Sequence, residues 1–248
     1  MSDAAYVNLT VAGGIATIEF FHPKGNSLPS AMLEDITQKI YNAENDERAK
    51  VIVIQSGGEK AFCAGASFDE LSTIHDAESG REFFIGFGNI INAIRKSSKF
   101  VIARVHGKCV GGGVGIAAAA DYTLAMEGAD VKLSELAIGI GPFVIGPAVE
   151  RKIGKSAFTA LAIDAQMWRN ADWARRKGLY AELHPNRENL DEAVHRLAES
   201  LTHYSPEAMK YLKRTFWEGT EHWDNLLASR AEISGKLLVQ GKALLNNK

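Results

Sequence analysis

The chain opens with two short runs in which apolar and polar residues alternate, at 6–11 and 15–21. Alternation with a period of two is typical of strands that bury one face. Ala12, Gly13 and Gly14 lie between the two runs, and the glycines can supply the positive φ that a tight turn requires. The pattern therefore predicts a β-hairpin over residues 6–21.

A helix is predicted next, beginning near Pro29, because proline is favoured at the start of a helix. Apolar residues then recur three or four positions apart until the polar stretch at 44–50, and they share one helical face: Leu33, Ile36, Ile40 and Ala43. This spacing indicates an amphipathic helix.

Two continuous β-branched runs, at 50–55 and 100–105, predict strands buried in a parallel sheet. The segment 81–97 between them has a helical pattern, and strand, helix and strand in this order is typical of a crossover unit. After a further short run at 122–126, helical patterns dominate. We therefore predict an α/β fold with a helical C-terminal subdomain from about residue 190.

Composition and charge exclude several classes of protein. The 28 basic and 30 acidic residues give a net charge of −2 without a long run of like charge, which argues against nucleic acid as a partner. The first residues lack a secretory signal, and no apolar stretch has the length of a membrane span. These features favour a cytoplasmic protein without a membrane partner. Cys63 and Cys109 lack the spacing of a metal site, and we predict two buried thiols.

Small residues follow two of the predicted strands. Residues 63–66 read Cys-Ala-Gly-Ala, and 111–113 are three glycines. Where a strand ends, tiny side chains and a helix start together expose backbone N–H groups to a negatively charged oxygen. The glycine spacing does not fit the nucleotide-phosphate motifs, so the two loops predict a paired oxyanion hole.

Four segments, "KAFCAGASFDEL", "VHGKCVGGGVGIAAAADYTLA", "VKLSELAIGIGP" and "IGKSAFTALAIDAQMWRNADWARRKGL", resemble the crotonase family of enoyl-CoA hydratases and isomerases in order and spacing. The resemblance implies a spiral of ββα units over 1–189 and a helical trimerisation subdomain over 190–248. It also implies a homotrimer or a dimer of trimers, an acyl-CoA thioester as substrate, and no metal or other cofactor.

The resemblance assigns roles to particular residues. The backbone N–H groups of Ala64 and Gly112 would hold the thioester oxygen, where negative charge develops as an enolate forms. Removing one such donor from a comparable site costs about 2.7–4 kcal/mol. The substrate-binding positions that the resemblance implies are Lys24, Ala64, Gly65, Ala66, Ser67, Gly111, Gly112 and Phe143.

Glu135 is the predicted proton-transfer group, because a carboxylate in an apolar pocket has a raised pKa. An alternative is an exposed glutamate that caps a helix beside Ser134. Typical hydratases of the family resemble one another in having a second glutamate, and Gly115 stands at its position here. Candidates for a replacement acid follow the first loop: Asp69, Glu70, Asp76 and Glu82.

With one carboxylate, moving a proton between two carbons is simpler than adding water. Several activities stay open: isomerase, dehalogenase, hydration of 3-methylglutaconyl-CoA, or a scaffold that binds coenzyme A without catalysis. Ser67 and Phe143 depart from the family pattern and would reshape the acyl pocket, and the tail at 241–248 departs as well. Activation of Cys63 by His106 is a further, less favoured, possibility.

Overall fold

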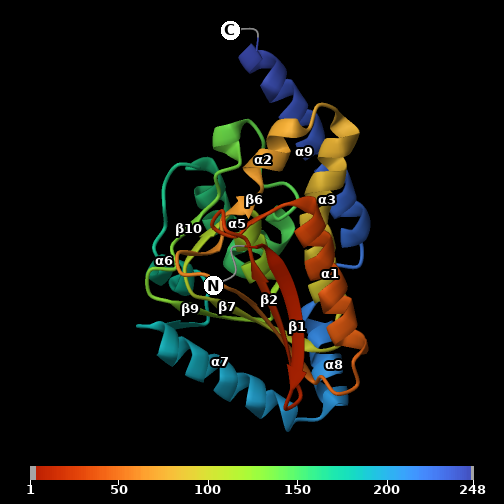
Figure 1. Ribbon diagram of the computed structural model, residues 1–248, viewed down its shortest axis with the longest axis vertical. Helices are drawn as coiled ribbons and strands as arrows, with labels where there is room; N and C mark the ends of the chain where they lie inside the picture. Colours follow the sequence, from red (N-terminus) through yellow and green to blue (C-terminus); the bar gives the residue numbers. More distant parts are fainter. Residues whose placement is uncertain (1–3, 247–248) are drawn as a thin grey trace.

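A computed structural model describes residues 4–246 of the chain, and the side chains up to residue 241. Its centre is a six-stranded sheet with the strand order β1-β2-β4-β7-β9-β11 (Figure 1). The first two strands form the predicted hairpin and pair antiparallel, and each later neighbour pairs in parallel. The strands are β1 (Tyr6–Ala12), β2 (Ile15–Phe21), β4 (Val51–Ser56), β7 (Phe100–Val105), β9 (Tyr122–Met126) and β11 (Glu182–His184).

Short strands form two smaller sheets beside the large one. One contains β10 (Val131–Lys132), β8 (Lys108–Val110) and β5 (Ala61–Cys63), and the other pairs β3 (Ser27–Leu28) with β6 (Gly65–Ala66). Along the chain, a strand of the large sheet is followed by a strand of a small sheet and then by a helix. This repeat is the predicted spiral of ββα units.

Helices complete each turn of the spiral. The helix predicted after Pro29 is α1, and Glu70 caps it by accepting a hydrogen bond from the Ser30 backbone N–H at 2.8 Å. The helix predicted over 81–97 begins earlier, because the Asp76 side chain accepts from the Ser79 N–H and caps it there. These helices are α1 (Ser30–Asn45), α2 (Phe68–Thr73), α3 (Ala77–Lys96), α4 (Gly112–Ala119), α5 (Gly146–Ile163) and α6 (Ala171–Arg176).

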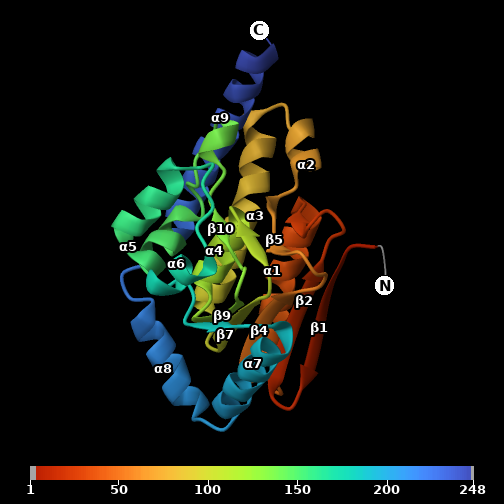
Figure 2. The same ribbon diagram turned by 90° about the vertical axis from the view of Figure 1, so that its left-hand side faces the viewer.

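The two faces of the large sheet bury separate clusters of apolar residues. The larger cluster lies between the sheet and α1, α3 and α4, with Ile18, Ile54 and Ala103 on the sheet side. On the opposite face, α7 (Arg187–Thr202) and α8 (Pro206–Phe216) cover a smaller cluster that includes Val53 and Ile102 (Figures 1 and 2). Successive strand residues therefore point to alternate cores.

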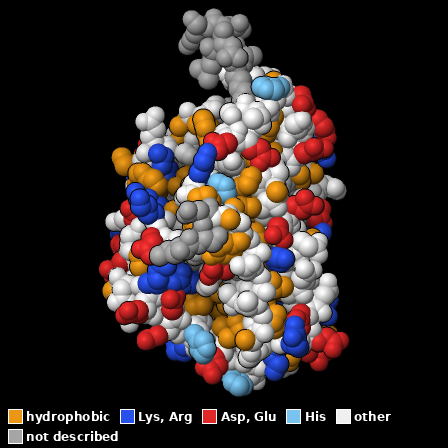
Figure 3. Space-filling model, in the orientation of Figure 1, with side chains coloured by type: hydrophobic (Ala, Val, Ile, Leu, Met, Phe, Trp, Pro, Cys, Tyr) orange, Lys and Arg blue, Asp and Glu red, His pale blue; other side chains and the backbone are white. Residues whose placement is uncertain are grey.

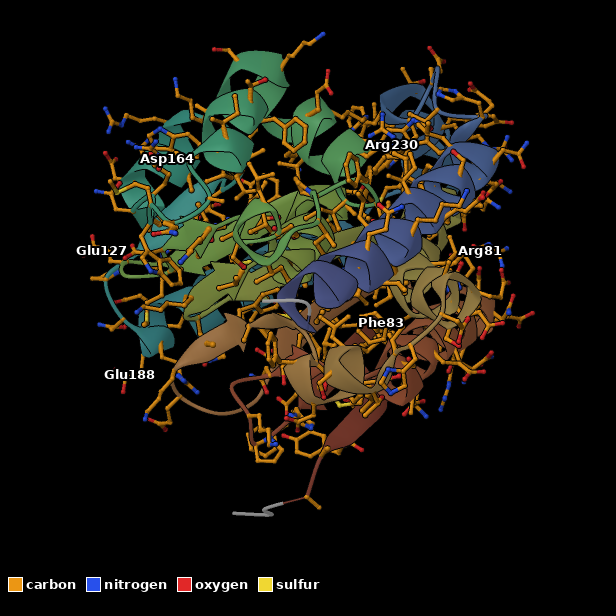
Figure 4. All side chains as sticks on the ribbon, turned by 90° about the horizontal axis from the view of Figure 1, so that it is seen from above. Arg81, Phe83, Glu127, Asp164, Glu188 and Arg230 are labelled. Atoms are coloured by element: carbon orange, nitrogen blue, oxygen red, sulfur yellow. The ribbon has the colours of Figure 1, made fainter. Side chains whose placement is uncertain are left out.

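The helical C-terminal segment begins close to the predicted residue 190, but it does not form a core of its own. Trp217 and Leu227 join the larger cluster. The last helix, α9 (Trp223–Asn246), lies along α3, where Gly80 and Gly235 bring the two backbones together. Figure 4 shows α9 crossing over the molecule, with Phe83 of α3 on one side of it. Its role in trimerisation stays a prediction.

Surface charge and helix apolarity are the two properties that concern nucleic-acid and membrane partners. On the face drawn in Figure 3, acidic and basic side chains lie among one another rather than in one continuous basic area. Within residues 4–246, none of the helices combines the length and apolarity needed to cross a membrane.

Candidate active site

A cavity of about 360 Å³ lies where the two small sheets, α4 and the C-terminal helix meet. Its size is in the range of small-molecule sites. The sequence-predicted site residues that line it are Lys24, Ala64, Gly65, Ala66, Ser67, Gly111, Gly112, Glu135 and Phe143. The fold therefore brings together side chains and backbone from four separate segments of the chain.

Two glycines at the start of α4 are required for different reasons. Gly111 has a φ of 51°, and a Cβ there would lie 2.9 Å from Glu135 Oε1. A Cβ on Gly112 would lie 2.0 Å from the ring of Phe87. Because Gly112 is the first residue of α4, its N–H has no partner within the helix and is available to a ligand.

The Ala64 N–H, which is the predicted donor to the thioester oxygen, has another partner in this structure, because it donates to the Gly25 carbonyl at 3.2 Å. A thioester oxygen would have to replace that hydrogen bond. The next loop residue, Gly65, has a φ of 89°, and a Cβ there would lie 3.1 Å from the Val110 carbonyl and 3.6 Å from the Gly112 nitrogen. Gly65 thus brings the first loop against the start of α4.

Ala66 presents its N–H instead. It pairs with Leu28 in the parallel β3–β6 ladder, where the following residue, Ser67, donates to the Leu28 carbonyl at 3.0 Å. Neighbouring amides of a strand point to opposite sides, so the Ala66 N–H is directed away from β3. Since Ala66 lines the cavity next to the Gly65–Gly112 contact, its amide is the better match for Gly112.

Glu135 lies just before a 3₁₀ turn, η1 (Leu136–Ile138), and its carboxylate reaches Gly111. Its Oε2 is buried and has no hydrogen-bond partner among the described residues. Burial raises the pKa of the carboxyl to about 7, against a smaller opposing effect of its own backbone amide. The alternative of an exposed capping glutamate is therefore wrong, since the side chain makes no capping hydrogen bond.

Three of the four candidate replacement acids bind other groups of the protein, and the fourth lies outside the cavity lining. Glu70 and Asp76 cap α1 and α3, as described above. Asp69 lines the cavity but forms an ion pair with Lys24 at its mouth, where both side chains are well exposed. Glu82 lies outside the described lining of the cavity.

Cys63 and His106 do not form an activated pair. Both cysteines are free and buried, as predicted. Burial raises the pKa of the Cys63 thiol to about 12, while its sulfur accepts a hydrogen bond from the Gly65 N–H. Neither ring nitrogen of His106 has a partner among the described residues, and burial lowers the pKa of His106 to about 4. A neutral thiol without a base is a poor nucleophile.

The two residues that depart from the family pattern, Ser67 and Phe143, both lie at the cavity. The Ser67 side chain caps α2 by accepting from the Glu70 N–H at 3.5 Å. Phe143 lines the cavity, and its carbonyl accepts from Arg230 of α9 at 3.3 Å. The side chains of the departing tail lie outside the described residues from 242 onward.

Sequence reasoning missed, among other residues of the cavity lining, five apolar side chains and one serine. They come from α3, from the loop before α5 and from α9: Phe84, Phe87, Ile140, Val144, Ile145 and Ser234. Each belongs to an ordinary apolar or helical pattern, so the sequence contains no signal that separates them from core residues. The folding of α9 onto α3 is what brings Ser234 to the site.

Within the part of the chain that the structure describes, no group of three or more His, Cys, Asp or Glu side chains could hold a metal ion.

The chain is similar in sequence to two proteins whose names describe acyl-CoA enzymes. The chain is 30% identical to the short-chain-enoyl-CoA hydratase of Clostridium acetobutylicum, over 93% of this chain and 88% of that protein. It is 29% identical to the carnitinyl-CoA dehydratase of Escherichia coli K12, over 95% of each chain.

Solved structures have the same fold. DspI of Pseudomonas aeruginosa matches with a TM-score of 0.81 and 26% identity, over 91% of each chain. The enoyl-CoA hydratase of Bacillus halodurans matches with a TM-score of 0.87, over 97% of this chain and 99% of that one, and at 21% identity it supports the fold alone. Residues 10–237 match the family described as Enoyl-CoA hydratase/isomerase. The chain therefore belongs to the enoyl-CoA hydratase/isomerase family, the crotonases, and is an enzyme of that family.

Proposed function

We propose that the protein acts on an acyl-CoA thioester through an enolate whose oxygen accepts hydrogen bonds from the Ala66 and Gly112 N–H groups. Glu135 is the group that moves the proton. One observation carries this proposal: a buried carboxylate with a pKa of about 7 lies against the start of α4 in the same cavity as both amides.

The chemistry follows from this arrangement. The Glu135 carboxylate takes a proton from the carbon next to the thioester carbonyl, and the C–H electron pair moves onto the carbonyl oxygen. Two fixed N–H groups stabilise the negative charge that develops there. A base with a pKa near the working pH transfers a proton in either direction at a useful rate.

The lining of the cavity favours an uncharged acyl group. Its inner part is apolar and aromatic, with Phe84, Phe87 and Val144 among the lining residues. Lys24 is the one cationic side chain in the described lining, and it lies at the exposed mouth, where it suits a phosphate of the coenzyme. A carboxylated acyl chain such as 3-methylglutaconyl would be buried without a charge partner, which is costly.

Replacing Glu135 by glutamine tests the proposal. Glu135→Gln keeps the shape and removes the basic group, so kcat should fall about 10²–10⁴-fold while binding of an acyl-CoA changes little. The measurement is solvent deuterium incorporation into a panel of saturated and unsaturated acyl-CoA esters, read by mass spectrometry.

Glu82→Gln is the matched control, because Glu82 lies outside the cavity lining, and it should exchange deuterium at the wild-type rate. A Glu135→Gln protein that exchanges as fast as wild type would contradict the proposal. Tight binding of acetoacetyl-CoA by a wild type that exchanges and converts no ester would favour the scaffold alternative.

We also propose that the protein is a homotrimer or a dimer of trimers, works in the cytoplasm, and needs no cofactor beyond the coenzyme A part of its substrate. The C-terminal helices from α7 onward are the segment expected to form the subunit contacts.

A further inference from the structure

A second cavity lies on the face of the large sheet that α7 covers, whereas the candidate active site lies on the side of α3 and α4. It is a groove of about 520 Å³ between α7 and the strands β1, β2, β4 and β7. Among the described residues, the two cavities share none of their lining. The groove has the size of a small-molecule site, and the proposed chemistry gives it no role.

Charged side chains gather at one end of this groove, where β4 and β7 end and α7 begins. Gln55 of β4 and Arg104 of β7 are partners in the parallel register, and both line the groove. Arg187 is the first residue of α7, and Asp191 follows one turn later. The start of a helix adds partial positive charge at this end.

Both arginines have N–H groups to which the described part of the chain offers no acceptor. The Arg104 side chain is 6% exposed, and its one hydrogen bond there runs from Nε to Asp191, so both Nη groups are unpartnered. Arg187 donates from Nη2 to the Gly58 carbonyl at 2.9 Å and, within the described residues, forms no ion pair. The planar guanidinium fork matches two oxygens of a carboxylate or phosphate.

The buried ring of His106 shows that these charges lie close together. Neither of its nitrogens has a hydrogen-bond partner among the described residues. Burial is the largest cause of its lowered pKa; Arg187 and Arg104 lower that pKa further, and Asp191 raises it. Because Coulomb interactions weaken with distance, the three charges surround one point. Two positive charges and one negative charge leave an excess of one positive charge there.

The other titratable groups of the described lining have partners of their own. Glu19 accepts from the Tyr6 hydroxyl at 2.7 Å and from the Gln55 amide at 2.6 Å. His195 lies two turns along α7 from Arg187 and is 3.8 Å from Glu199. Neither group neutralises the excess charge at the start of α7.

The rest of the groove suits an organic body and not a bare ion. Small polar and apolar side chains line it away from the arginines: Thr10, Ala12, Thr17, Val53, Val194 and Ala198. Since α7 runs along the groove from Arg187 to Ala198, the charged end is followed by a less polar one.

We propose that this groove is a second binding site, for a small organic anion whose carboxylate or phosphate group is held by Arg104 and Arg187 and whose body lies along α7. The same donors would hold either group, so the test uses one probe of each kind.

Titration calorimetry at low salt compares butyrate with n-propyl phosphate, which share a three-carbon body. At least one should bind wild type with a Kd of about 1 mM or below, and the tighter probe identifies the group. Added salt should weaken this binding. The ring signals of His106 in an NMR spectrum should shift as the probe saturates the site.

Arg187→Gln should weaken binding of that probe at least about tenfold, because it removes one of the two guanidinium groups. Arg196→Gln is the matched control: Arg196 lies on the same helix, is 63% exposed and lies outside the described lining of the groove. It should bind the probe within about twofold of wild type.

Asp191→Asn should change the affinity in the opposite direction. It removes the carboxylate that competes for Arg104, so the same probe should bind at least about threefold more tightly. A residue that only stabilises the fold would not produce tighter binding. This variant also carries the test if Arg187→Gln fails to fold after losing its hydrogen bond to Gly58.

The proposal is overturned if neither probe binds wild type at concentrations up to about 10 mM. It is also overturned if Arg187→Gln and Arg196→Gln weaken binding equally, or if Asp191→Asn weakens it, because the probe would then lie elsewhere. Acyl-CoA turnover by all three variants should stay within about twofold of wild type, since none of these residues lines the first cavity.

Discussion

At the scale of the residue, the burial of Glu135 should lower the free energy of unfolding at high pH, and this effect can be measured. Its pKa rises from 4.5 to about 7 on folding because burial disfavours the charged form. A group whose pKa is raised by folding contributes stability that is fully present below its unfolded pKa and is lost as the pH rises through the folded pKa. The carboxylate should therefore destabilise the protein at pH 8 and have little effect near pH 4.

Glu135→Gln should accordingly stabilise the protein in a pH-dependent way. At pH 8 the gain in the free energy of unfolding should reach up to about 3 kcal/mol, and at pH 5 it should fall below about 1 kcal/mol. Urea unfolding at the two pH values measures it, with Glu82→Gln as the control. A gain of equal size at both pH values would show that the change acts through packing and not through charge.

The proposed donor Ala66 can be tested without adding a side chain. Replacing Ala66 by lactic acid turns its amide into an ester and removes the N–H, and kcat/KM should fall about 10²–10³-fold. The same replacement at Ala64 removes its hydrogen bond to Gly25, and it should cost about 0.5–1.5 kcal/mol of stability with turnover kept. The reverse pattern, with activity lost at Ala64 and kept at Ala66, would restore the original assignment.

The sequence could predict this loop but not which of its amides faces the cavity. The small residues at 63–66 and 111–113 indicate exposed N–H groups, and the structure places both loops in one cavity. Which N–H points into the cavity depends on the register of β6 against β3 and on a carbonyl at Gly25. Both are set by residues about 40 positions away, beyond the reach of a local pattern.

At the scale of the element, α9 matters to the site because it lies against α3. A Cβ on Gly235 would lie 2.5 Å from the Ala77 carbonyl oxygen and 2.6 Å from the Arg81 nitrogen, both of them backbone atoms that cannot turn away. The neighbouring Ser234 lines the cavity. The packing of two helices is therefore also the positioning of one wall of the site.

Gly235→Ala should separate the helices. Overpacking of this kind costs about 1–3 kcal/mol, and the displaced wall should lower kcat/KM by about tenfold or more. Gly241→Ala on the same helix is the control, since a Cβ there meets no atom within 4 Å, and it should be neutral or slightly stabilising. Thermal unfolding and acyl-CoA turnover measure both effects. Equal stability of the two variants would contradict the close approach.

Predicting elements from the sequence worked best where the pattern is long. The hairpin, α1 and the buried strands β4 and β7 follow from periodicity, and α3 differs at its start because the Asp76 cap extends it. The two-residue strands β3, β6 and β10 are too short to produce a pattern. They are nevertheless the strands that shape the first loop and its neighbour β8, so local periodicity misses much of what forms the site.

At the scale of the whole molecule, the segment predicted to drive assembly leaves an apolar face uncovered. The inner face of α8 is anchored by Met209 and by Lys213, whose ammonium donates to Asp121 at 2.8 Å. Large apolar side chains on or beside the helix are about half exposed: Tyr204, Tyr211, Leu212 and Phe216. An exposed group of this kind is typical of a subunit contact.

Leu212→Asp tests whether the C-terminal segment forms the trimer. Wild type should have a mass of about three or six times 26.9 kDa by light scattering. A charge at Leu212 would be buried without a partner in the subunit contact, so this variant should shift toward a single chain at micromolar concentration.

Ile163→Asp, at a residue 69% exposed on α5, should keep the wild-type mass, because Ile163 lies outside the segment from residue 190 onward. If Ile163→Asp dissociates the assembly and Leu212→Asp does not, the subunit contact lies on the spiral of ββα units and the trimerisation role of the C-terminal helices is wrong. In that case the C-terminal segment would serve the site alone, through α9.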